Sequence, residues 1–246
     1  MQSTAIDMSA TQSNELHTAD AESLAAQFNA QNEFIAVESF LNADRLQQLL
    51  DALPQLEPHV HRNFIPYHKK GGSISRYDLT EHAPVFDELY RSPELIEFLR
   101  RLTGQALDLC PADDPHACAL YYYTEAGDHI GFHYDTSYYD GERYTVLLGL
   151  VDDSSCELEY ELYRTDPNRE NVPGAMSLKP GAMVVFNGDK LWHRITPSAA
   201  GERRVALTLE YVTSAHMRPF QRFVSNMKDA IAYFGFRQVF ARAGKR

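Results

Sequence analysis

A His-x-Asp triplet followed by a distant histidine constrains the fold of this chain more than any other feature. The triplet is His133-Tyr134-Asp135, and His193 follows 60 residues later. On an extended strand, side chains two residues apart point to the same side, so His133 and Asp135 can reach one point while Tyr134 faces away. For His193 to reach that point as well, a later strand must fold over the first.

The chain around these residues has the pattern of such strands. Pro180-Gly181 predicts a turn, and the apolar run that follows predicts a buried strand and a second turn before His193, which would open the next strand. Tyr144–Val151 and Val205–Val212 are two further β-rich apolar runs. Several strands are therefore expected after the triplet.

Two imidazoles and one carboxylate are the donor set with which mononuclear iron(II) oxygenases hold their metal, leaving the opposite positions open for an oxidant and a co-substrate. His133, Asp135 and His193 are therefore the candidate metal ligands and catalytic residues. A single His-x-Asp triplet also arises by chance. From the triplet alone, a surface histidine and a turn aspartate in an ordinary β-protein remain an alternative.

Between residues 120 and 212 the ordered set of elements resembles the iron(II)/2-oxoglutarate-dependent oxygenases, in particular the branch similar to prolyl and phytanoyl-type hydroxylases. The elements are Tyr121-Tyr122-Tyr123, the Gly127 turn, His133-x-Asp135, the strand Tyr144–Val151, Pro180-Gly181, His193, and a basic residue ten or eleven positions further on. The resemblance implies a mainly β fold with helical extensions: a double-stranded β-helix (jelly-roll) core packed by N- and C-terminal helices.

The expected organisation is a flexible segment over residues 1–31, in which residues 21–29 could form a short helix, and a single oxygenase domain over 32–246. Its jelly-roll core would cover about 106–213, and a helical region about 217–242. Leucines at helical intervals predict an amphipathic helix from about 43 to 53 that Pro54 ends. A second helical region, 84–102, would stop at Gly104.

The resemblance implies three reactants at the metal: iron(II), 2-oxoglutarate as co-substrate, and O2. In the family a distal arginine or lysine pairs with the remote carboxylate of 2-oxoglutarate. Arg204 is preferred because it shares a strand face with the small residues Ala206 and Thr208, whereas Arg203 faces the larger apolar side chains, although spacing from His193 permits either. Three tyrosines are further hydroxyl candidates for that carboxylate, or sheet-packing residues: Tyr121, Tyr123 and Tyr144.

The resemblance also implies the type of reaction. Radical halogenases of this superfamily carry a small residue in place of the carboxylate ligand, which frees a position for chloride. Asp135 occupies that position here. The expected reaction is therefore hydroxylation of an unactivated C–H bond.

The segment Gly71-Gly72 followed by Arg76 looks like the branch that contains free amino acid halogenases and their hydroxylating relatives. This likeness implies a small zwitterionic substrate, namely a free amino acid, with a basic one as an option. Arg76 would bind its carboxylate, and Glu125 or Asp128 would bind an amine. The alternative for Arg76 is a surface arginine after a flexible turn.

Composition limits the partners. The net charge of −11 argues against phosphate-mediated nucleic-acid binding. No apolar stretch reaches the roughly 18 residues of a membrane span, and three cysteines without a C-x-x-C pair indicate a reducing compartment. A cytoplasmic enzyme with a small-molecule substrate is expected, and the sequence sets no oligomeric state.

Two other classes of protein remain open. A cupin-like metal enzyme that does not use 2-oxoglutarate would need the histidines but not Arg204. A noncatalytic β-sandwich binding module would need neither. His59 and His61 are expected in a solvated loop beside Pro58, and no zinc site is inferred from them.

Overall fold

The structure is a computed structural model that describes residues 18–218 together with 221, 227, 233 and 234. Its strands are β1 Phe34–Val37, β2 His61–Ile65, β3 Lys69–Ile74, β4 Asp108–Leu109, β5 Cys118–Tyr123, β6 His129–His133, β7 Arg143–Asp153, β8 Leu158–Leu162, β9 Val172–Met176, β10 Met183–Asn187, β11 Trp192–Ile195 and β12 Arg203–Val212. Its helices are α1 Thr18–Ala30, α2 Ala43–Asp51, α3 Leu53–Leu56, the short 3-10 helix η1 Glu57–His59, α4 Arg76–His82, α5 Val85–Tyr90 and α6 Pro93–Thr103.

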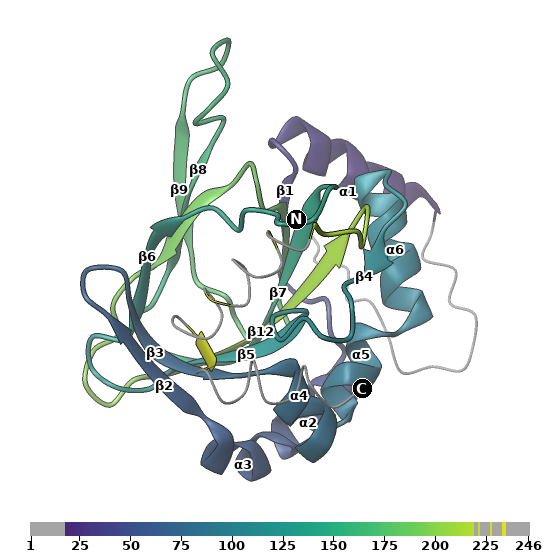
Figure 1. Cartoon of the computed structure of the whole chain (residues 1–246). Coiled ribbons are helices and arrows are strands. Elements are labelled where there is room, and N and C mark those ends of the chain that lie inside the picture. The colour runs from purple at the N-terminus through teal and green to yellow at the C-terminus, as the bar shows by residue number, and fades with distance from the viewer. Residues whose placement is uncertain (1–17, 219–220, 222–226, 228–232, 235–246) are drawn as a thin grey trace.

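The strands form one curled sheet in the order β1-β10-β7-β12-β5-β3-β6-β11-β8-β9, with β2 added to β3 and β4 added to β12. Every pairing is antiparallel. Helices α2, α4, α5 and α6 lie along one side of the sheet, while the β8–β9 hairpin projects away from them (Figure 1). The predicted mainly β jelly-roll with helical extensions is confirmed.

Strand alternation separates the core from the interior of the curl. On β12, Val205, Leu207 and Leu209 are fully buried in the main hydrophobic cluster beneath the helices. The residues between them, from Arg204 to Glu210, face the opposite side. A helix-covered core on one face thus leaves the other face free to line a pocket.

The ends of the helices agree with the capping residues in the sequence. Ser92 caps α6 by accepting a hydrogen bond from the Leu95 backbone N–H at 3.2 Å, and Gly104 ends the helix in the left-handed conformation with φ of 69°. The region 84–102 is nevertheless two helices, α5 and α6. Pro54 does not end α2 but lies in the first turn of α3, where a missing backbone N–H costs no hydrogen bond.

The N-terminal boundary differs from the prediction. Within the segment expected to be flexible, residues 18–30 form α1, in agreement with the helix that was an option at residues 21–29; it packs on α6 and buries Phe28 completely. The stretch after β8 ends in β9. Most of the predicted helical region 217–242 lies outside the described residues.

Candidate active site

The two histidines of the predicted metal site are direct cross-strand partners. His133 is the last residue of β6, His193 is the second residue of β11, and the two are paired in the antiparallel register. Their ring centroids lie 4.3 Å apart. Asp135 lies two residues beyond the end of β6 rather than within the strand as expected, yet its carboxylate reaches both rings, with Oδ1 3.4 Å from His133 Nε2 and Oδ2 3.8 Å from His193 Nε2.

Both imidazoles present the same nitrogen to this centre. His133 Nδ1 lies 2.8 Å from the Gly131 carbonyl and His193 Nδ1 lies 3.1 Å from the Leu191 carbonyl. Because a carbonyl can only accept, each Nδ1 carries the proton and each Nε2 keeps its lone pair for a metal. Burial, with the adjacent His133, lowers the pKa of His193 to about 4, so its ring is neutral at physiological pH.

The third group is a carboxylate held in its charged form. Burial alone would raise the pKa of Asp135, but the neighbouring His193 and His133 imidazoles and the charge of Arg143 bring it well below the ordinary value. One ligand atom from each of the three residues lies within 4.8 Å of the other two. A carboxylate and two imidazoles at this spacing fit the donor set of an iron(II) centre.

Behind Asp135 lies a polar chain that the sequence reasoning missed. The Thr145 hydroxyl lies 2.9 Å from Asp135 Oδ2 and 3.1 Å from Glu210 Oε2, and Arg143 Nε donates to the same Glu210 oxygen at 2.6 Å. Outer hydrogen bonds of this kind fix the orientation of a metal ligand. The sequence did contain a signal for these residues. Side chains two residues apart on a strand point to the same face, so Glu210 shares the face assigned to Arg204, and Arg143 shares a face with Thr145.

Gly188 is a second supporting residue of the site that the sequence reasoning did not single out. A Cβ built on it would meet the Asp135 carbonyl oxygen at 2.5 Å and the Asp135 Cβ at 3.0 Å. The turn between β10 and β11 therefore presses against the backbone of the candidate ligand. Only a residue without a side chain permits this approach.

Gly188→Ala is accordingly expected to displace Asp135 and to weaken iron binding by roughly 10- to 100-fold, the range typical of lost ligand support. Anaerobic iron(II) titration would measure it. Gly127→Ala is the control, since a Cβ there meets nothing within 4 Å and only its φ of +82° is strained. Equal iron affinity in the two variants would contradict this role of Gly188.

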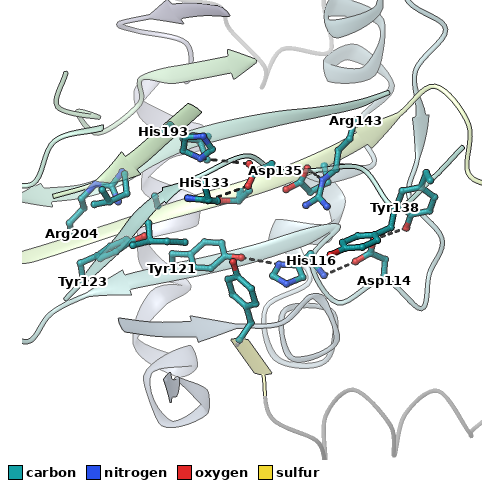
Figure 2. A pocket seen from close by; sticks show the side chains of 18 of the residues that line it. Asp114, His116, Tyr121, Tyr123, His133, Asp135, Tyr138, Arg143, His193 and Arg204 are labelled. Carbon is teal, nitrogen blue, oxygen red and sulfur yellow. Dashed lines mark hydrogen bonds and ion pairs between the residues drawn. The ribbon is translucent and has the colours of Figure 1, made fainter. Parts of the chain in front are cut away.

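The pocket extends in both directions from the three candidate ligands (Figure 2). Arg204 and Tyr123 lie at one end, and Arg143, Tyr138 and Asp114 lie at the other, with Tyr121 and His116 along one wall. Five strands of the curled sheet, β5, β6, β7, β11 and β12, contribute to the lining together with the segment before β5. The arrangement places two separate polar regions on either side of the metal-binding residues.

Arg204 is the polar group at the first end. Its side chain is 2% exposed, its guanidinium lies 5.0 Å from the centre of the Tyr123 ring, and its Nε has no hydrogen-bond partner. No carboxylate of the described residues forms an ion pair with it. A buried guanidinium without an anion is costly, so this end of the pocket suits a carboxylate ligand.

Arg203 and Tyr144 do not reach the pocket. Arg203 lies at the surface, where it forms an ion pair with Glu57 at 3.0 Å, because its position on the strand faces the opposite side of the sheet. The Tyr144 hydroxyl bonds to Glu33 at 3.0 Å and its ring packs in the main core. As candidates for binding 2-oxoglutarate both are wrong, whereas Tyr121 and Tyr123 line the pocket.

Arg76, predicted to bind a substrate carboxylate, lies outside this pocket. It is 3% exposed at the start of α4, donates from Nε to Asp87 at 3.1 Å, and packs over the Tyr90 ring at 4.9 Å. The Gly71-Gly72 segment before it is the middle of β3 rather than a flexible turn. Arg76 therefore ties α4 to α5, and the substrate role is a wrong prediction.

The two carboxylates predicted to bind a substrate amine already interact with other groups of the chain. Asp128 is fully buried and accepts hydrogen bonds from Arg62 at 2.6 Å and from the Thr124 and Glu125 backbone N–H groups. Glu125 has a side chain that is 58% exposed and pairs with Arg62 at 3.0 Å. Both belong to the turn between β5 and β6, where an acidic cluster in the sequence reflects turn formation rather than ligand binding.

The second end of the pocket carries groups that the sequence reasoning did not single out. Asp114 Oδ2 accepts from the Tyr139 hydroxyl at 2.6 Å, and Oδ1 accepts from the His116 backbone N–H at 2.8 Å. The Tyr121 hydroxyl and His116 Nδ1 are 2.9 Å apart. The result is a fixed carboxylate across the pocket from Arg143.

Comparison with solved structures supports the fold. SnoN, an alpha-ketoglutarate-dependent epimerase of nogalamycin biosynthesis, has a TM-score of 0.65 with 16% identity over 79% of this chain and 81% of its own. A prolyl hydroxylase from Trichoplax adhaerens bound to a peptide has a TM-score of 0.63 with 15% identity, covering 85% and 93%. A 2OG-Fe(II) oxygenase family member from Burkholderia pseudomallei has a TM-score of 0.62 with 16% identity, covering 88% and 99%.

No protein-family model matches the chain, and no curated protein matches it by sequence. The chain thus has the fold of the iron(II)/2-oxoglutarate-dependent oxygenases at a low level of sequence identity. The similar structures include an epimerase and a peptide hydroxylase. Their fold alone therefore does not specify a substrate.

Proposed function

We propose that this protein is an iron(II)- and 2-oxoglutarate-dependent dioxygenase that hydroxylates an unactivated C–H bond of a small molecule. The observation that carries the proposal is a single pocket in which His133, Asp135 and His193 converge beside a buried arginine that has no anionic partner among the described residues. A metal enzyme that does not use 2-oxoglutarate would have no use for that arginine.

The residues present fit the two cofactors. His133 Nε2, His193 Nε2 and an Asp135 oxygen would hold iron(II), and Arg204 would bind the distal carboxylate of 2-oxoglutarate. When bound, the pair supplies activation of O2, with 2-oxoglutarate oxidised to succinate and CO2 while one oxygen atom enters the substrate. The side chains of Tyr121 and Tyr123 would lie along the co-substrate.

The presence of Asp135 favours hydroxylation over halogenation. Its carboxylate is charged, lies near both histidines, and is supported by the Thr145 hydroxyl. A protein ligand in this position leaves no place for a halide beside the two histidines. Thr145, Glu210 and Arg143 would hold this carboxylate in place during turnover.

The substrate that we propose is a free amino acid, with a basic one favoured. Arg143 uses only its Nε for Glu210, so its two terminal nitrogens can bind a substrate carboxylate. Asp114 lies at the same end of the pocket and can accept from an ammonium group. Because Glu210 already offsets the charge of Arg143, Asp114 gives this end a net negative charge that suits a cation.

This substrate assignment gives a direct test. Asp114→Asn is expected to lower kcat/KM for basic amino acids roughly 10- to 100-fold, the effect of losing a charged hydrogen bond, with a smaller change for neutral ones. Asp113→Asn is a matched control, because Asp113 does not line the pocket. A uniform loss across all amino acids, or none, would refute the role of Asp114.

The proposed function itself is tested by anaerobic titration of the purified protein with iron(II) and 2-oxoglutarate. The chelated keto acid should give its weak visible charge-transfer band, and succinate should form when O2 and substrate are added. Iron binding without the band would favour a cupin-like enzyme. Absence of iron binding in correctly folded protein would favour a binding module.

None of the described helices has the length and apolar surface that a bilayer span requires. Cys110, Cys118 and Cys156 are all buried free thiols, which agrees with a reducing compartment. The cytoplasmic location expected from the sequence stays a prediction.

A further inference from the structure

A second cluster of metal-ligating side chains lies outside the active-site pocket, on the helical side of the molecule. It consists of His59 at the end of η1 and of Asp78 and His82 on α4. One ligand atom from each lies within 4.8 Å of the other two, the same spacing that the three active-site residues meet. None of the three lines the active-site pocket.

The two imidazoles of this cluster are stacked, with ring centroids 3.8 Å apart and planes inclined by 19°. Both are partly buried. Within the described part of the chain, neither ring forms a hydrogen bond or an ion pair. Four ring nitrogens are thus gathered in a half-buried place.

Asp78 supplies the negative group. It is one helical turn before His82, so the two side chains share a face of α4. The carboxylate is only 4% exposed, and the Ser75 hydroxyl donates to its Oδ2 at 3.1 Å. That hydrogen bond orients the carboxylate in the way outer groups orient metal ligands.

We infer that His59, Asp78 and His82 form a second metal site, which takes a divalent transition ion of the zinc type. Two imidazoles and one carboxylate are nitrogen and oxygen donors that such ions accept, with a water completing a tetrahedron. Bonds of about 2.1 Å would bring the donor atoms to roughly 3.4 Å from one another. The two stacked rings would have to rotate apart so that one nitrogen of each points at the ion.

The function of the site would be structural. The ion would tie η1 to α4, which precede and follow the β2–β3 hairpin. β3 in turn pairs with β5 and β6 of the active-site sheet. Metal binding would therefore stabilise the folded state, since the unfolded chain does not gather these three residues.

The test uses zinc with the full chain in a background of Asp135→Ala and His193→Ala, which disables the active-site ligands. Equilibrium dialysis is expected to retain one zinc ion per chain, and zinc should raise the Tm. Adding His82→Ala should abolish both effects. Cobalt(II) as a second probe should give a tetrahedral visible spectrum that the same substitution removes.

His61→Ala is the matched control, because His61 is a nearby, partly buried histidine on β2 that does not belong to the cluster. It should leave zinc binding and the Tm shift unchanged. If His82→Ala unfolds the protein, His59→Ala is used in its place. No zinc retention in the background variant, or equal retention after His59→Ala or His82→Ala, would overturn the second site without touching the proposed oxygenase activity.

Discussion

His193→Ala is expected to abolish turnover and to lower iron(II) affinity by roughly 100-fold or more, since even the loss of a ligand's supporting group costs 10- to 100-fold. The histidine offers its free Nε2 opposite Asp135, and the ring is 5% exposed. Iron titration with the visible charge-transfer band as readout measures the loss. Circular dichroism should show a native spectrum, because an open metal site does not hold the core together.

His129→Ala provides the control for this prediction. His129 begins the strand that His133 ends, and its Nδ1 lies 2.8 Å from a backbone carbonyl, as in the two candidate ligands. It belongs to no metal-binding group among the described residues. If His129→Ala lost iron while His193→Ala kept it, the metal site would have to be reassigned.

The second large effect is expected at Arg204. Arg204→Ala should raise the KM for 2-oxoglutarate by about 100-fold, because truncating one partner of a buried charged pair costs about 2–5 kcal/mol. Arg204→Lys should recover only part of the affinity, since an ammonium lacks the two-pronged donor geometry that matches a carboxylate. Initial rates at varied 2-oxoglutarate, with substrate saturating, give the value directly.

The adjacent residue serves as the control. Arg203→Ala removes the same charge from the same strand, but Arg203 is paired with Glu57 at the surface. Its KM for 2-oxoglutarate should stay within about twofold of the unsubstituted enzyme, as exposed ion pairs contribute little. A high KM in Arg203→Ala combined with a normal KM in Arg204→Ala would reverse the assignment of the two arginines.

Local strand geometry explains why much of the site could be predicted. Side chains alternate along any strand regardless of what the strand packs against. The small residues Ala206 and Thr208 therefore marked the pocket face of β12, and the position of Arg204 followed. The same rule extended by one step would have found Glu210.

The wrong predictions concern charged residues whose interaction partners come from distant parts of the chain. Arg76 was expected to bind a substrate carboxylate, but its guanidinium instead pairs with Asp87 on α5 and packs over the Tyr90 ring. Asp128 was likewise predicted to bind a substrate amine, but its carboxylate accepts a hydrogen bond from Arg62 on β2. Neither partner could be identified from the residues adjacent in sequence, because both pairs depend on how distant elements pack.

The jelly-roll class was implied by resemblance to a known family. The sequence by itself determined the candidate donor set for a metal and the face of β12 that carries Arg204. Those features depend on residue type and on backbone periodicity, which are local. Tertiary structure decided the rest: that His133 and His193 are register partners, that Asp114 and Arg143 meet across the pocket, and that His59 joins Asp78 and His82. These groupings arise from strand register and helix packing, and such long-range contacts are fixed only when the whole core is assembled.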